Sequence, residues 1–219
     1  MRNKKVICLA MLILVIFGIV SHLNNNSNIY AIEVSNIGVS LIENGELCRG
    51  VLFSKQINQL KPGKIYQEEI MAQNSGEIEI YVRVIIYKYF KNQAGEKVID
   101  ISPQFIGVGV NEENWVIDGR ATTEERIVCY YKYPIAPGEE TTAVTTMLQI
   151  SPEINNIYKL VNENKNSGIS ITTVPKCNDY KVQIEIKIDA VQSHNAQDAI
   201  KSAWGVDVNI DSQGTLSLK

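Results

Sequence analysis

This sequence has few of the residues from which zinc sites and nucleophilic enzymes are built. Its 219 residues include two histidines, His22 and His194, and four cysteines. It contains no His-Glu-x-x-His segment and no Cys-x-x-Cys pair, and Asp207–Asp211 lacks the glycine and glutamate frame of an EF-hand loop. A serine or cysteine nucleophile would have only His194 as its base, because His22 belongs to the N-terminal leader described below. We therefore expect no catalytic residues, no metal and no cofactor, and we interpret His194 as structural.

An excess of positive charge is absent as well. The chain has 21 Lys and Arg against 24 Asp and Glu, a formal net charge of −3. Arg2, Lys4 and Lys5 are the only charged residues before Ile32, so residues 32–219 carry −6. A mildly acidic body lacks the basic footprint that nucleic acid or anionic lipid would require. We expect no nucleic-acid partner, and contact with a membrane only through the N-terminal leader.

The N-terminus has the layout of a secretory signal peptide. A basic start is followed by 15 uncharged, mostly apolar residues, Val6 to Val20, then by a polar patch and by Ile29-Tyr30-Ala31. This order predicts cleavage after Ala31, a mature chain that begins at Ile32, and secretion. An uncleaved membrane anchor is the alternative. A helix of that length spans only about 22 Å, which is less than the roughly 30 Å of a hydrocarbon core.

Three cysteines, Cys48, Cys129 and Cys177, remain after the leader. They allow at most one internal disulfide and leave one thiol over. The sequence leaves open whether a spare thiol is exposed or is buried as a small apolar side chain.

The apolar pattern of the mature chain is that of β-strands. In Glu77–Phe90, Ile78, Ile80, Val82, Val84 and Ile86 share one face, which predicts a central strand of an antiparallel sheet. Val182–Ala190 alternates apolar with charged residues and predicts a half-buried strand. Asn195–Trp204 predicts a short helix, with Asn195 as its N-cap and Gly205 as its stop. Glu153–Asn164 is a second helix candidate.

Some eight short strands separated by Pro-Gly turns predict an all-β chain. The expected architecture is a two-sheet antiparallel β-sandwich of jelly-roll or immunoglobulin-like type, with one short C-terminal helix. We expect three parts: a signal peptide over residues 1–31, a single sandwich domain over residues 32–210, and a flexible tail over residues 211–219.

Several short stretches, taken in order, carry a family resemblance that covers nearly all of residues 32–210. They are Leu60–Gly63 with Pro62 and Gly63, Asn74–Gly76, Tyr81–Val84, Trp115 with Asp118-Gly119, the tyrosine-rich run around Tyr131, Ala136–Glu139 with Pro137 and Gly138, and Ala203–Val206 with Trp204 and Gly205. Together with the leader they resemble the TasA/camelysin family of Gram-positive secreted proteins. The chain departs from that pattern in the nine residues Arg120 to Val128, in Met147-Leu148 and in Cys129.

The resemblance implies a jelly-roll-like sandwich, an extracellular or cell-surface location on a Gram-positive bacterium, and a role as a biofilm-matrix fibre subunit. Its implied partners are further copies of itself or related matrix subunits, and a signal peptidase during export. Camelysin-type relatives have been described as metalloproteases, which makes a metalloprotease the remote alternative. The second hypothesis is a cell-surface binding or adhesin-like module.

Two surfaces are candidates for these roles. The first is the new N-terminus, where Ile32, Val34, Ile37, Val39 and Leu41 form a short β-like run. By analogy with the resembled fibre subunits, this run is expected either to complete the sheet of a neighbouring subunit or to fold back as the first strand of its own sandwich. The second is a set of tyrosines that either pair across strands or bind a carbohydrate or partner: Tyr87, Tyr89, Tyr130, Tyr131 and Tyr133.

Overall fold

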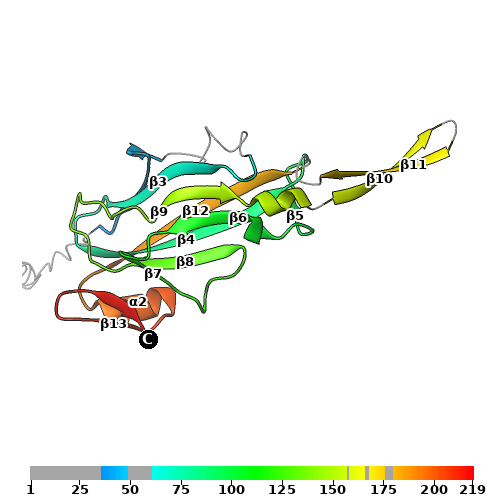
Figure 1. Cartoon of the computed structure of the whole chain (residues 1–219). Coiled ribbons are helices and arrows are strands. Elements are labelled where there is room, and N and C mark those ends of the chain that lie inside the picture. Colours follow the sequence, from blue (N-terminus) through cyan, green and yellow to red (C-terminus); the bar gives the residue numbers. More distant parts are fainter. Residues whose placement is uncertain (1–35, 49–60, 157, 166–167, 176–179) are drawn as a thin grey trace, which may run out of the picture. The chain divides into compact units, whose positions relative to one another are not determined.

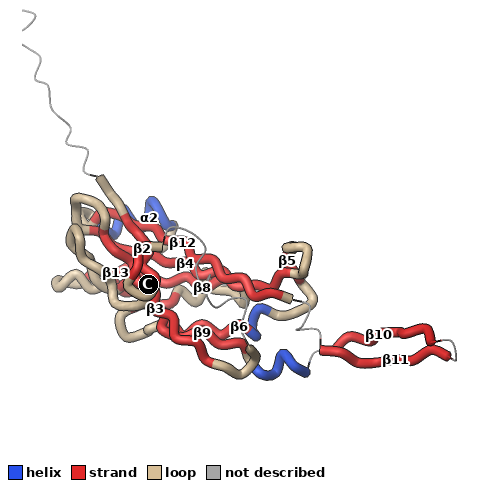
Figure 2. The backbone as a smooth tube through the Cα atoms, turned by 90° about the horizontal axis from the view of Figure 1, so that it is seen from above, coloured by secondary structure: helices blue, strands red, loops and turns tan. Residues whose placement is uncertain are grey.

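The computed structural model describes residues 36–48, 61–156, 158–165, 168–175 and 180–219. These residues build two antiparallel sheets of five strands, and the main apolar cluster lies between them (Figure 1). The chain is therefore an all-β protein with the two-sheet antiparallel sandwich that its strand pattern predicts, and Figure 2 shows how little of it is helical. The expected signal peptide and Cys177 lie outside the described residues.

The first sheet, sheet A, has the strand order β2-β1-β3-β9-β6. Its strands are β1 (Val39–Glu43), β2 (Glu46–Leu47), β3 (Ile65–Asn74), β6 (Ile106–Val110) and β9 (Thr145–Ile150). A tight turn joins β1 to β2, in which Asn44 and Gly45 both have positive φ, 51° and 80°. Asn-Gly is the pair that this kind of hairpin turn favours.

The second sheet, sheet B, has the order β12-β4-β8-β7, with β5 paired beside β4. Its strands are β4 (Ile80–Lys91), β5 (Lys97–Val98), β7 (Trp115–Ile117), β8 (Arg126–Tyr131) and β12 (Lys181–Gln192). Strand β4 pairs with β12 along its whole length and with β8 on its other side. The prediction that Glu77–Phe90 forms a central strand is confirmed.

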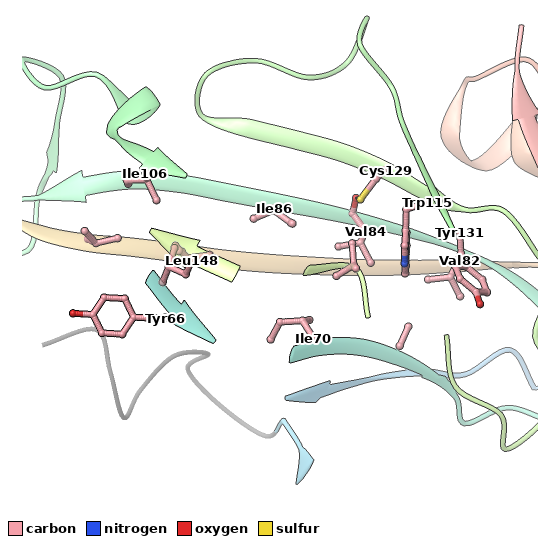
Figure 3. Close-up of a cluster of buried hydrophobic side chains, with 14 of the residues drawn as sticks. Tyr66, Ile70, Val82, Val84, Ile86, Ile106, Trp115, Cys129, Tyr131 and Leu148 are labelled. Atoms are coloured by element: carbon pink, nitrogen blue, oxygen red, sulfur yellow. The ribbon is translucent and has the colours of Figure 1, made fainter. Parts of the chain in front are cut away.

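The core between the sheets follows from the alternation of β4. Val82, Val84 and Ile86 are at most 1% exposed, and Figure 3 shows them lying with Ile70 and Leu148 of sheet A. Burying a side chain of this size contributes about 1.5–3 kcal/mol. This row therefore holds the two sheets together.

The outer face of sheet B carries a second apolar cluster at one end. There it is covered by helix α2 (Ala196–Trp204) and by the hairpin of β13 (Val208–Ile210) and β14 (Leu216–Leu218). Ile200 of α2 and Leu216 of β14 are at most 1% exposed. Gly205 ends the helix in the left-handed conformation, with φ 72°, as predicted. The expectation of a flexible tail over residues 211–219 is wrong, because burial of Leu216 and pairing with β13 fix this segment.

Two local expectations differ from the structure. Pro152–Asn156 forms only a short 3-10 helix, η3, and the following residues form strand β10 (Tyr158–Lys165), which pairs with β11 (Gly168–Pro175). The expected helix over Glu153–Asn164 is wrong, since hairpin pairing outweighs the helical pattern of a segment rich in asparagine. Asn195 does occupy the N-cap of α2, but its φ is 50° and its side chain makes no capping bond. Within the described ranges, no helix has the length and apolar character to cross a membrane.

Candidate functional site

The predicted donor segment is partly built into the chain's own sheet. Val39 and Leu41 lie in β1, pair with β3, and are half-buried against the core. Ile37 lies just before β1 and is 44% exposed. Ile32 and Val34 lie outside the described residues. The C-terminal half of the segment therefore forms the first strand of its own sandwich, and donation by the N-terminal half stays a prediction.

Strand β12 forms a long lateral edge of sheet B, which we call the β12 edge. Among the described residues it pairs with β4 alone. The N–H of Ser193 donates to the C=O of Glu79 at 2.9 Å, in register with this ladder. Alternate residues of an antiparallel strand point their backbone groups to opposite sides. The open side of β12 therefore presents the N–H and C=O groups of Val182, Ile184, Ile186, Ile188 and Ala190.

The side chains along this edge are incompletely covered. Ile184 is 1% exposed, whereas Ile186, Ile188 and Ala190 are only half-buried against the core. Strand β1, whose side chains Val39 and Leu41 are also half-buried, lies nearby on sheet A. This side of the sandwich thus has two features together. Its outward backbone groups are paired with no described strand, and its apolar side chains are ones that an added strand would cover.

The predicted tyrosine set is divided among several places. The ring of Tyr131 lies in the core, 5.1 Å from that of Trp115, and Tyr133 packs edge-on against it. Tyr130 points to the opposite face of β8, where its ring lies 5.4 Å from that of Trp204. Neighbouring positions of a strand face opposite ways, so consecutive tyrosines in the sequence do not form one surface.

Tyr87 and Tyr89 lie on the outer face of sheet B, at the end that the second apolar cluster leaves uncovered. With charged side chains from β5, from β12 and from Glu125, the residue before β8, they line an open hollow of about 190 Å³. We call this surface the tyrosine patch; it consists of Tyr87, Tyr89, Lys97, Glu125, Glu185 and Lys187. The Tyr89 hydroxyl donates to Glu185 at 2.6 Å. Burial, together with this bond, raises the pKa of Tyr89 to about 12, so the hydroxyl keeps its proton at neutral pH.

Arg83 separates the tyrosine patch from the covered end of the sheet. Its guanidinium donates to the Asp189 carboxylate at 2.6 and 3.1 Å and lies 5.2 Å from the ring of Trp204. Trp204 therefore packs on the outer face of sheet B. It is one of the family-like positions named from the sequence.

The remaining family-like positions serve the fold. Both Pro-Gly turns dock on strands: the N–H of Gly63 donates to Ile150 O, and the N–H of Gly138 donates to Asn74 O, each at 2.8 Å. The indole N–H of Trp115 donates to Thr142 O at 3.2 Å. Pro62 and Pro137 precede these glycines, which adopt the positive φ of 81° that the turns need.

The structure brings no catalytic constellation together in its described part. His194 is exposed in the turn before α2. Cys129 is a buried thiol, and burial raises its pKa to about 12, which disfavours the thiolate that nucleophilic attack requires. Within the described ranges, no group of three His, Cys, Asp or Glu residues could hold a metal ion. The absence of catalysis stays a prediction.

Sequence reasoning named single residues of the tyrosine patch and the strand that forms the β12 edge, but it did not predict either surface. The alternation in β4 and β12 does place Tyr87, Tyr89, Glu185 and Lys187 on one face of each strand. Which strands are neighbours, and which strand lies at an edge, depends on pairing between segments about 100 positions apart.

Comparison of the chain with protein-family models, with curated proteins and with solved structures gave no match in any of the three.

Proposed function

We propose that this chain is a secreted structural subunit of an extracellular matrix fibre that assembles by strand addition. The observation that carries the proposal is the β12 edge. An extended segment from a neighbouring copy would bond to its outward N–H and C=O groups and would cover Ile186 and Ile188. Backbone bonds of this kind supply affinity, and the apolar row selects the register.

The donor in this proposal is the N-terminal run that begins at Ile32. Since Val39 and Leu41 already belong to β1, the donated part is residues 32–38, or else β1 leaves β3 during assembly. The signal-peptide pattern and the order of family-like motifs support export and a fibre role. A surface-binding module is the second candidate, favoured by the tyrosine patch, and a metalloprotease remains the remote alternative.

The experiment follows assembly of protein that starts at Ile32, by sedimentation and by electron microscopy. The key variant is Ala190→Pro, because the Ala190 N–H points away from β4 and proline is tolerated where an edge N–H faces outward. It should fold, shown by an unchanged far-ultraviolet spectrum, and remain monomeric. Ala190→Ser keeps the N–H and adds only a hydroxyl group to the side chain, so it should form fibres like the parent.

Deletion of Ile32–Gly38 tests the donor without removing β1. The proposal expects a folded protein that no longer polymerises alone. Fibres formed by both the deletion variant and Ala190→Pro would refute assembly by strand addition. A parent protein that stays monomeric at high concentration would refute the fibre role itself. Aspartate at Val39 or Leu41 is less informative, because it would also place charge against the chain's own core.

A further inference from the structure

The uncovered end of sheet B has a surface that the fibre proposal does not use. Helix α2 and the β13–β14 hairpin cover the end around Tyr81 and Val191, and Figure 1 shows α2 and β13 at one end of the sheet. In the described part of the chain, the end around Tyr89 forms an open hollow. Register fixes which side chains meet there: Tyr87 lies opposite Glu185, Tyr89 opposite Gln183, and Lys91 opposite both Lys97 and Lys181.

We propose that the tyrosine patch binds an acidic polysaccharide, with sugar rings stacked on Tyr87 and Tyr89 and sugar carboxylates paired with the surrounding lysines. Two tyrosines at positions i and i+2 of one strand point the same way, about 6.8 Å apart along the chain. Such rings offer an apolar face with a polar tip, which suits the alternation of C–H and hydroxyl groups on a sugar.

The lysines give the patch its preference for an acidic ligand. The ammonium of Lys187 lies 5.3 Å from the Tyr87 ring centroid, and those of Lys91 and Lys97 lie 5.6 Å from that of Tyr89. Lys97 also forms an ion pair with Glu125 at 2.6 Å. Lys91 and Lys187 show only their contacts with tyrosine rings, so each can bind a ligand carboxylate without first breaking an ion pair with an acidic residue in the described part of the chain.

Two carboxylates in the patch argue for a sugar rather than a nucleic acid. Glu125 and Glu185 line the hollow, and a carboxylate can only accept hydrogen bonds at neutral pH. Sugar hydroxyls donate to such groups, whereas a phosphodiester backbone offers acceptors and negative charge.

The test measures binding of the full chain to polygalacturonate by affinity electrophoresis and calorimetry. The first control ligand is the same polymer with its carboxylates methyl-esterified, which removes the negative charge. The second control ligand is a single-stranded oligothymidylate, which tests binding of nucleic acid. The proposal expects binding to polygalacturonate that weakens with added salt and is at least about tenfold weaker for the esterified polymer. Equal binding to both polymers, tighter binding to the oligonucleotide, or no binding to polygalacturonate would overturn it.

Variants locate the site. Tyr87→Ala with Tyr89→Ala, and separately Lys91→Gln with Lys187→Gln, should each weaken polygalacturonate binding about tenfold. Tyr133→Ala, a 39% exposed tyrosine elsewhere, and Lys201→Gln, an exposed lysine of α2, should bind like the parent. Unfolding midpoints confirm that each variant is folded.

Parent-like binding by both patch variants would overturn the assignment. Binding can be measured apart from fibre formation: strand addition would use the outward backbone groups of β12, whereas the patch consists of side chains on the outer face of sheet B, two of them, Glu185 and Lys187, from β12.

Discussion

The side chain of Asn74 donates a hydrogen bond to the backbone oxygen of Ile135 at 2.9 Å, inside the sandwich. The same amide donates to Ile78 O at 2.8 Å and accepts from the N–H of Gly76 at 2.9 Å. Asn74 is 0% exposed, and its side chain ties the end of β3 to the segment before β4 and to the segment after β8. A polar residue buried this completely stabilises the fold only while all its bonds are made.

Replacement of Asn74 by alanine should therefore be costly. Asn74→Ala removes three hydrogen bonds to backbone groups, of which Ile135 O keeps its bond from the Ile80 N–H at 3.1 Å, and we expect a loss of about 3 kcal/mol in the free energy of unfolding. Urea unfolding followed by fluorescence measures this change. Gln73→Ala, next in sequence but bonded only near the surface to Glu140, is the control and should cost less than about 1 kcal/mol. Similar losses for the two variants would contradict the role given to Asn74.

Arg83 and Trp204 should be energetically coupled. The guanidinium over the indole ring, at 5.2 Å, predicts a coupling energy of about 0.5–1 kcal/mol in a double-mutant cycle of Arg83→Ala and Trp204→Ala. Arg83→Ala also loses the ion pair with Asp189, which lowers the free energy of unfolding by itself. The cycle cancels this contribution, because it is lost with or without Trp204. Strictly additive losses would show that this contact contributes nothing.

The C-terminal hairpin should contribute measurably to stability. Leu216 is 1% exposed among the residues of the second apolar cluster, so Leu216→Ala should lower the free energy of unfolding by about 2–4 kcal/mol. Leu47→Ala removes the same side chain from a site that is 45% exposed and should cost less than about 1 kcal/mol. A negligible effect at Leu216 would restore the view of residues 211–219 as a loose tail.

Tyr89 should titrate late. Its folded pKa of about 12, raised by burial and by the bond to Glu185, lies above its unfolded value of about 10. The protonated form is therefore favoured by folding, and its stabilising contribution is lost as pH rises from about 10 to about 12. Absorbance at 295 nm measures the titration. Glu185→Gln removes the charge that accepts the bond, so the Tyr89 part of the titration should move to lower pH. If that part of the titration does not move, the Glu185 contact is excluded as a cause of the raised pKa.

Cys129 should resist alkylation while the chain is folded. It is 0% exposed, and burial raises the pKa of its thiol to about 12. Iodoacetamide at pH 8 followed by peptide mass mapping should find Cys129 unmodified in native protein and modified in urea, because reaction needs an exposed thiolate. Rapid native labelling would show that β8 opens easily.

The sequence by itself determined the elements with strong periodicity. Alternation over Glu77–Phe90 and Val182–Ala190 specified two strands and the face that each buries, because a strand repeats every two residues. Glycines with positive φ marked the turns at Gly63 and Gly138 and the end of α2 at Gly205, since few other residues adopt that conformation at low cost. These signals are local, so one stretch of chain contains all the information.

Tertiary structure alone decided what depends on neighbours. Tyr130 and Tyr131 look like one cluster in sequence, yet the pleat sends one ring into the core and the other under α2. Leu216 follows a polar turn and resembles a tail until the outer face of sheet B buries it. The β12 edge and the tyrosine patch exist only because β12 pairs with β4 in one register and, in the described part of the chain, with nothing on its other side. Pairing across such long separations is chosen by the total burial of the sandwich, which no local pattern encodes.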